Sequence, residues 1–240
     1  RSGFQIIRLD KYLADMSVGS RSECKNYIRN GRVKVNSNII LDPNIKVKEE
    51  DMISFDDNIV SYEKYSYYMV NKPSGVVSAT RDNHSETVLD LIVDKKHKDL
   101  FPVGRLDKDT EGLLLITNDG DLAHKLLSPK KKVDKVYYAK VNGIISDNDR
   151  EAFAKGVIIG DGYTTLPASL HIINSAEVSE LELTIHEGKF HQVKQMFEAV
   201  GKEVIYLKRL SMGSLVLDPK LRSGEYRFLT EEEIDKLKGM

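Results

Sequence analysis

One uninterrupted apolar run constrains the fold of this chain more than any other feature. Residues 112–117 read Gly-Leu-Leu-Leu-Ile-Thr and are followed by the turn residues Asn118-Asp119-Gly120. Such a run predicts a strand that is buried on both faces. Further strands are expected at residues 67–70, 136–141 and 181–185, and helices at residues 121–127 and around the apolar stripe Phe190, Val193, Phe197 and Val200. We therefore predict an α+β fold on a mostly antiparallel mixed sheet with flanking helices.

The first 60 residues predict a small unit of their own. Ser20 and Glu23 form a capping box that begins a helix, and Gly31 is suited to end it in a left-handed conformation. Residues 32–36 alternate basic and apolar side chains, as a strand with one wet face does. The composition changes over residues 56–66, which predicts a linker. We expect two domains, residues 1–60 and residues 61–240.

Basic residues are concentrated in the first unit. Arg21, Lys25 and Arg29 recur every four residues and therefore share one face of the expected helix. A helix face of this kind can straddle phosphates and bind RNA in a salt-sensitive way, but it also fits an ordinary solvated surface. The whole chain has 36 Lys and Arg against 37 Asp and Glu, which excludes a strongly basic polyanion binder and leaves only a local basic face.

The order of these features resembles the S4 RNA-binding domain over roughly residues 7–55. The resemblance implies a small αα-β module that contacts RNA phosphates. The residues to which it assigns these contacts are Arg8, Lys11, Arg21, Lys25, Arg29, Arg32 and Lys34.

Several kinds of chemistry find no support. One cysteine excludes an intramolecular disulfide, the phosphate-binding Gly-x-x-x-x-Gly-Lys-Ser/Thr motif is absent, and no apolar run reaches the ~20 residues that span a bilayer. The histidines are scattered, so we expect no metal. Paired carboxylates could still hold two Mg²⁺ ions as nucleases do, and the candidates are Asp107, Asp109, Asp119 and Asp121. For Asp119 and Asp121, a turn and a helix start are the simpler explanations. We expect a cytoplasmic protein without membrane contact.

A polar loop with Arg105 and Asp107 leads directly into the apolar run. A carboxylate at this position is rigidly placed and partly desolvated. Burial alone would raise its pKa, whereas a nearby cation would keep it ionised. From the residues alone, an Arg–Asp pair that braces the loop and a catalytic carboxylate explain the pattern equally well.

Four motifs in order resemble the pseudouridine synthases, in the branch shared by the RsuA and RluA families. They are Lys72-Pro73-x-Gly75, then Gly104-Arg105-Leu106-Asp107-x-x-Thr110-x-Gly112-Leu113-Leu114, then Lys135-Val136-Tyr137, then Glu-Gly-Lys-Phe-His-Gln-Val-Lys-Gln-Met at residues 187–196. The Gly-Lys-Phe-His-Gln-Val-Lys form is most similar to the RsuA family. Gln195 stands where the family pattern has Arg, which removes a charge near the RNA.

The resemblance implies an isomerase that needs no cofactor. Asp107 would attack the target uridine, or abstract a proton in the competing glycal route, and Lys194 would be its ion partner. Tyr137 would lie over the uracil ring, and Arg105 would fill the place of the flipped base. Without the resemblance, Tyr137 fits a core aromatic. Further RNA contacts are implied for Lys72 and for the basic run Lys130, Lys131 and Lys132, which otherwise fits a solvated loop.

The expected substrate is one uridine of 16S ribosomal RNA, within an assembly intermediate of the small subunit, and the expected state is a monomer. Two alternatives stay open: a synthase of the same chemistry that acts on 23S rRNA, and a non-catalytic S4-type ribosome assembly factor. The metal nuclease is a third, and it would lose its activity in EDTA.

Overall fold

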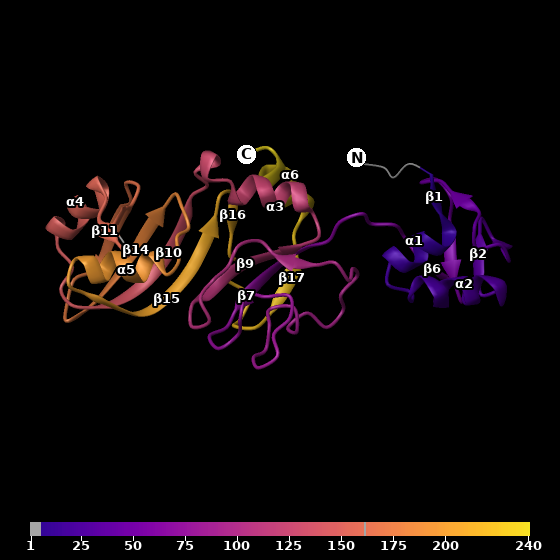
Figure 1. Cartoon of the computed structure of the whole chain (residues 1–240), viewed down its shortest axis with the longest axis horizontal. Coiled ribbons are helices and arrows are strands. Elements are labelled where there is room, and N and C mark those ends of the chain that lie inside the picture. Colours follow the sequence, from indigo (N-terminus) through magenta and orange to yellow (C-terminus); the bar gives the residue numbers. More distant parts are fainter. Residues whose placement is uncertain (1–5, 161) are drawn as a thin grey trace. The chain divides into compact units, whose positions relative to one another are not determined.

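Figure 1 shows the computed structural model of the chain, which describes residues 6–160 and 162–240. The described residues divide into two compact units. The first contains the residues up to Ser66 together with Val93–Leu100, and the second contains Tyr67–Ile92 and Phe101–Met240. The segment Val93–Leu100 thus packs with the first unit, although it falls inside the predicted second domain. The predicted boundary after residue 60 stays a prediction.

The first unit combines two helices with short strands. Helix α1 (Leu9–Asp15) packs against α2 (Arg21–Arg29), and both bury apolar residues against a four-stranded sheet. The strands of that sheet, in spatial order, are β3 (Asn38–Ile39), β2 (Val33–Val35), β5 (Ile53–Phe55) and β6 (Asn58–Ile59), and a separate pair joins β1 (Ile7–Arg8) to β4 (Lys46–Val47). The predicted capping box of Ser20 and Glu23 is present, and Gly31 has a φ of +73°.

The prediction that residues 56–66 form a linker is wrong. Asp56 and Asp57 make the turn of a hairpin in which β6 pairs with β5. The hydroxyl of Tyr12 donates to the carbonyl of Val60 at 2.6 Å, and the ring of Tyr62 packs on the ring of Tyr12 with centroids 5.1 Å apart. The change in composition therefore marks the edge of the first unit, where polar turn residues and tyrosines replace the aliphatic core.

The second unit is built on one large sheet, which has nine strands among the described residues. Along its path lie β13 (Ser169–Asn174), β14 (Val178–Ile185), β10 (Lys135–Asn142), β15 (Glu203–Met212), β9 (Glu111–Thr117), β7 (Tyr67–Lys72) and β17 (Tyr226–Phe228); β16 (Leu215–Val216) pairs with β15 and β8 (Phe101–Pro102) with β9. Among these described pairs only β9–β15 is parallel. The predicted α+β class and mostly antiparallel sheet are confirmed.

Helices and short turns flank this sheet. Helix α5 (Gln192–Ala199) packs against β15 (Figure 1), and α4 (Asp147–Lys155) packs against β13. The remaining elements are α3 (Gly120–Leu127), the 3₁₀ turn η1 (Pro129–Lys131), the hairpin β11 (Ile158–Ile159) with β12 (Tyr163–Thr164), and α6 (Glu231–Lys238). None of the helices in the described part of the chain is long and apolar enough to span a membrane.

The predicted apolar helix stripe is only partly correct. Val193 and Phe197 are buried, and Phe197 meets Phe153 of α4 edge to face. Phe190, however, precedes the helix, is 77% exposed and stacks on the ring of His191. The chain turns at His191, which has a positive φ of +48°, so the helical spacing does not extend back to Phe190.

The parallel contact between β9 and β15 depends on Gly112. It is short, since it pairs only Glu111 with Lys208 and Gly112 with Arg209. Gly112 has a φ of +101°, and a Cβ atom there would lie 2.2 Å from the carbonyl oxygen of Arg209. Only glycine combines that backbone conformation with so close an approach.

We predict that Gly112→Ala lowers the free energy of unfolding by about 3 kcal/mol or more, because it adds both backbone strain and a clash with β15. Urea unfolding followed by circular dichroism measures this loss. Gly120→Ala is the matched control, since nothing lies within 4 Å of its added methyl group and it begins a helix. A Gly112→Ala protein as stable as the control would contradict the assignment.

Candidate active site

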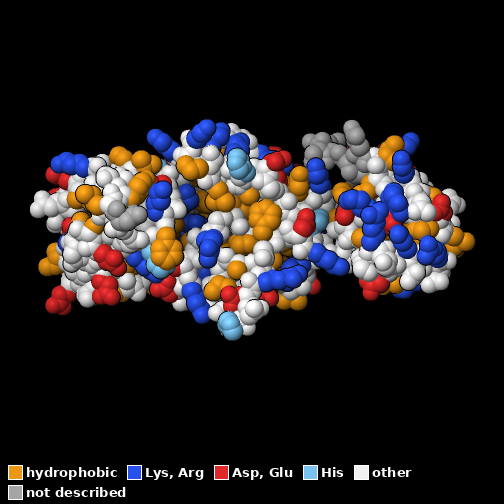
Figure 2. Space-filling view, viewed as in Figure 1, with side chains coloured by type: hydrophobic (Ala, Val, Ile, Leu, Met, Phe, Trp, Pro, Cys, Tyr) orange, Lys and Arg blue, Asp and Glu red, His pale blue; other side chains and the backbone are white. Residues whose placement is uncertain are grey.

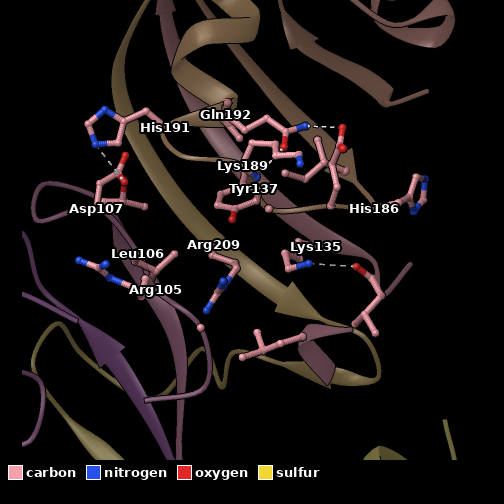
Figure 3. A pocket seen from close by; sticks show the side chains of 18 of the residues that line it. Arg105, Leu106, Asp107, Lys135, Tyr137, His186, Lys189, His191, Gln192 and Arg209 are labelled. Atoms are coloured by element: carbon pink, nitrogen blue, oxygen red, sulfur yellow. Dashed lines mark hydrogen bonds and ion pairs between the residues drawn. The ribbon is translucent and has the colours of Figure 1, made fainter. Parts of the chain in front are cut away.

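A pocket of about 300 Å³ lies beside the β9–β15 contact. Its walls come from the loop before β9, from β10, from the segment between β14 and α5, and from β15 (Figure 3). Four sequence-predicted residues line this pocket: Arg105, Asp107, Tyr137 and Lys194. Residues from three of the four motifs therefore meet in one place.

Asp107 faces nitrogen-bearing side chains from α5 and from the turn before it. The Lys194 ammonium lies 3.2 Å from Asp107 Oδ2, and His191 Nε2 lies 3.4 Å from Oδ1 (Figure 3 shows His191 pointing toward Asp107). The Asp107 side chain is 23% exposed, so it is accessible from the pocket and partly shielded from water. The predicted neighbour Lys194 is in place, whereas His191 was not predicted, although it stands three residues before Lys194 in the same motif.

Lys194 is held between two carboxylates. Its ammonium donates to Asp109 Oδ1 at 2.6 Å, which is closer than its contact with Asp107. Partial burial acts to lower the pKa of Lys194, but the hydrogen bonds to Asp109 and Asp107 outweigh it and raise that pKa. The hydrogen bond from Lys194 likewise lowers the pKa of Asp109. Lys194 is therefore a fixed positive charge beside Asp107.

The loop that carries Asp107 is fastened to its surroundings. The hydroxyl of Ser78 donates to the carbonyl of Leu106 and accepts from its amide, both at 3.0 Å. The carbonyl of Lys108 accepts from the amide of Gly75 at 2.8 Å and from the Lys72 ammonium at 3.0 Å. The loop is therefore rigid before any substrate binds.

Lys72 corrects one prediction. It was assigned to RNA binding, but its side chain is completely buried, and its ammonium donates to the carbonyls of Pro73 and Lys108. No RNA phosphate can reach it there. The motif Lys72-Pro73-x-Gly75 is instead a brace beneath the Asp107 loop.

Tyr137 and Arg105 occupy different depths of the pocket. Tyr137 is buried in β10 and Arg105 is exposed on the loop before β9, and both side chains line the pocket. The neighbouring Tyr138 faces away and binds Glu180 on β14, as the alternation of a strand requires. A base that enters past Arg105 would meet the ring of Tyr137.

The segment between β14 and α5 is shaped by its amide side chains. Glu187 accepts hydrogen bonds from Gln192 Nε2 at 2.8 Å and from the hydroxyl of Tyr163 at 2.6 Å. Gln195 donates to the carbonyl of Phe190 at 2.7 Å. The residue that departs from the family pattern therefore supports the turn that presents Phe190 and His191.

Five of the seven basic residues that were predicted to contact RNA in the first unit are paired within the protein. Arg8 and Arg21 both bind the buried carboxylate of Asp10, and the remaining pairs are Lys11 with Asp15, Arg32 with Asp56, and Lys34 with Asp57. In the described structure no acidic side chain lies within 4 Å of Lys25 or Arg29. Figure 2 shows Lys and Arg side chains gathered on the visible face of this unit. Lys25 and Arg29 are the uncompensated charges of the predicted basic face.

The basic run near the pocket is exposed. Lys130, Lys131 and Lys132 follow Pro129 on and after η1, and their neighbours Ser128, Pro129 and Val133 line the pocket while the lysines themselves do not. They remain candidates for RNA contact outside it.

The carboxylates considered for a nuclease do not gather. Asp119 is buried, caps α3 through the amide of Leu122 and accepts from the hydroxyl of Tyr67. Across residues 6–160 and 162–240, no group of three or more His, Cys, Asp or Glu is arranged to hold a metal ion.

Two family models match the chain. The model described as RNA pseudouridylate synthase matches residues 66–199, and the model described as S4 domain matches residues 7–53. A solved structure described as a crystal structure of pseudouridylate synthase has a TM-score of 0.68 and 37% identity, covering 96% of this chain and 99% of that one.

Three relatives are similar over nearly their whole length. The RNA pseudouridine synthase YtzG of Bacillus subtilis is 48% identical (96% of this chain, 98% of that protein). Ribosomal small subunit pseudouridine synthase A of Vibrio cholerae is 41% identical (95% and 98%), and ribosomal large subunit pseudouridine synthase B of Bacillus subtilis is 38% identical (97% and 96%).

The buried brace makes a prediction about pH. Burial lowers the pKa of Lys72 from its ordinary value of 10.5 to about 8. Below pH 8 both the folded and unfolded states hold the proton; between about pH 8 and 10.5 the unfolded state binds more protons, so stability gains as pH rises. Across this pH range, the free energy of unfolding of the wild type should therefore rise relative to that of Lys72→Met by on the order of 1 kcal/mol or more.

Urea unfolding of both proteins at several pH values measures this difference. Lys140→Met, which removes an exposed lysine, should show no comparable trend. A constant difference between wild type and Lys72→Met would mean that the Lys72 ammonium is not desolvated in the folded state.

Proposed function

The chain belongs to the RNA pseudouridylate synthase family, with an S4 domain before the synthase domain, and on this premise we propose that it converts one uridine of 16S ribosomal RNA into pseudouridine. The observation that carries the proposal is the placement of Asp107 at the pocket, 3.2 Å from the fixed charge of Lys194 and on one lining with Tyr137. The reaction is an isomerisation, so we expect it to need no cofactor.

The arrangement accounts for each chemical step. Asp107 attacks C1′ of the flipped uridine, or abstracts a ribose proton in the glycal route, and the C1′–N1 bond breaks with its electron pair left on uracil. The ring turns, and C5 bonds to C1′ as the bond between Asp107 and C1′ breaks and returns its electron pair to the carboxylate; in the glycal route, C5 bonds to C1′ as Asp107 gives the proton back to the ribose. The C5 proton then leaves to solvent and N1 takes up a proton. The Lys194 ammonium lies 3.2 Å from the attacking carboxylate, and Tyr137 supports the ring as it turns.

The small-subunit assignment has two supports. The relative from Vibrio cholerae that is 41% identical is named for the small ribosomal subunit, and the Phe190-His191 form of the last motif resembles the RsuA family. The alternative, 23S rRNA, is favoured by the 38% identical relative that is named for the large subunit. The paired Asp107 and Lys194 disfavour the non-catalytic assembly factor, since a binding module needs no such pair.

We assign the first unit to RNA anchoring. Lys25 and Arg29 have no acidic partner within 4 Å in the described structure, so they can exchange counterions for phosphates without breaking an internal ion pair. The expected partner is 16S rRNA in an assembly intermediate of the small subunit, bound by a monomer in the cytoplasm.

We predict that Asp107→Asn lowers the rate of pseudouridine formation at least about 1000-fold, because an amide cannot act as the anionic nucleophile or base. The assay follows tritium released from C5 of labelled 16S rRNA, with labelled 23S rRNA in parallel. Asp121→Asn, which changes an exposed carboxylate in the first turn of α3, is the matched control and should keep the rate within about tenfold. An Asp107→Asn rate within tenfold of the wild type would remove Asp107 from the mechanism.

We predict that replacing Lys25 and Arg29 by Ala weakens RNA binding and flattens the plot of log affinity against log salt by about 1 to 2 units, since two phosphate contacts are lost. Filter binding at several salt concentrations measures the slope. Lys140→Ala with Lys155→Ala removes the same charge from exposed positions of the synthase domain and should leave the slope unchanged. Equal slopes in all three proteins would show that the first unit does not anchor the RNA.

A further inference from the structure

Arg209 is a buried charge that the proposed mechanism has not used. Its residue is only 2% exposed, yet it lines the pocket from β15. Its Nε donates to the carbonyl of Leu113 at 2.9 Å, while the nitrogen Nη2 is buried and has no hydrogen-bond partner among the described residues. No carboxylate of the described structure lies within 4 Å of the guanidinium.

Such a group is costly to the folded protein. A buried N–H without a partner costs about 1–3 kcal/mol, and a buried charge without a counter-ion costs more. The hydrogen bond to Leu113 uses one N–H and does not require a positive charge. The charge itself therefore points to something that occupies the pocket only during the reaction.

The register of the sheet places Arg209 where the base must lie. Arg209 is directly opposite Tyr137 in the β10–β15 pair, so the two side chains are on the same face of the sheet (Figure 3). Lys135 precedes Tyr137 by two residues on β10, lines the same pocket and is partly buried. Burial, together with the charge of Arg209, lowers the pKa of Lys135, as expected for two cations that share one poorly solvated site.

We propose that Arg209, with Lys135 beside it, binds the uracil anion that exists between cleavage and rejoining, as an electrostatic stabiliser of the leaving group. This inference rests on the proposed function, because it needs uracil as the group released. When the C1′–N1 bond breaks, the electron pair spreads over N1, O2 and O4, and the guanidinium and ammonium stabilise that charge. The charge returns to the Asp107 carboxylate when C5 bonds to C1′, because Asp107 then leaves C1′ or gives the ribose its proton back, and proton loss from C5 and uptake at N1 complete the product.

The first test separates stabilisation of the anion from RNA binding. We expect Arg209→Gln to lower the single-turnover rate of tritium release at saturating RNA by about 100-fold or more, as removal of one oxyanion donor does, with RNA affinity within about threefold. Arg209→Lys, which keeps the charge, should recover at least about tenfold of that loss. Lys208→Gln is the matched control, since it removes a charge from the neighbouring position on β15, whose side chain faces the other side of the sheet.

A second test does not use ribosomal RNA. Wild-type protein is titrated at mildly alkaline pH with 5-nitrouracil, which is ionised, and with uracil, which is neutral. We expect the anion to bind at least about tenfold more tightly, and Arg209→Gln to lose this preference while it still binds uracil. Thermal unfolding of each variant establishes that it is folded, and Lys135→Met, which should reduce the same preference, replaces Arg209→Gln if that protein does not fold.

Two results would overturn the inference. One is an Arg209→Gln protein with an unchanged single-turnover rate, and the other is equal loss of affinity for 5-nitrouracil and uracil, which is the mark of a structural role. A third result separates the two proposals. If the wild type does not modify 16S rRNA, but binds 5-nitrouracil more tightly than uracil and loses this preference in Arg209→Gln, the substrate assignment fails and the inference stands.

Discussion

The close approach of Gly112 to the backbone of Arg209 is the contact on which the candidate site depends. It joins β9 to β15 in parallel and so links two groups of antiparallel strands into one sheet. Because the Asp107 loop ends where β9 begins, the same contact sets the distance between that loop and the pocket face of β15. A side chain at Gly112 would push apart the strands that carry the two sides of the pocket. The glycine of the Asp107 motif is therefore needed for assembly, whatever role the motif has in chemistry.

The pocket has positive groups at two separate places, which suits a reaction in which negative charge moves from a carboxylate to the uracil ring and back. On one side Asp107 lies beside Lys194 and His191, and on the other Lys135 and Arg209 lie near Tyr137 with no carboxylate within 4 Å of Arg209 in the described structure. In the proposed reaction the charge passes from the carboxylate to the uracil ring and back. Lys194 then stabilises the charge while it is on Asp107, and Arg209 with Lys135 stabilises it while it is on uracil. The negative charge is therefore compensated in both states of a poorly solvated site.

The sequence predicted the parts of this structure whose causes are local. The apolar run at residues 112–117 is a buried strand, and Ser20 with Glu23 caps a helix as the spacing requires. Tertiary contacts decided the rest. Lys72 is buried because two carbonyls of neighbouring loops converge on its ammonium, and Phe190 is exposed because the chain turns at His191. Among the seven predicted contact residues, Arg32 and Lys34 pair with acids distant in sequence, and in the described structure Lys25 and Arg29 are the two left without an acidic partner, which helical spacing could not predict.

The central claim is that the Asp107 pocket acts on one uridine of 16S rRNA, and mapping of pseudouridine in total ribosomal RNA from cells with and without the gene tests it most directly. The account predicts that one 16S position loses its pseudouridine, that all 23S positions keep theirs, and that wild-type protein but not Asp107→Asn restores the lost position. Loss of a 23S position with an unchanged 16S map, or restoration by Asp107→Asn, would contradict it.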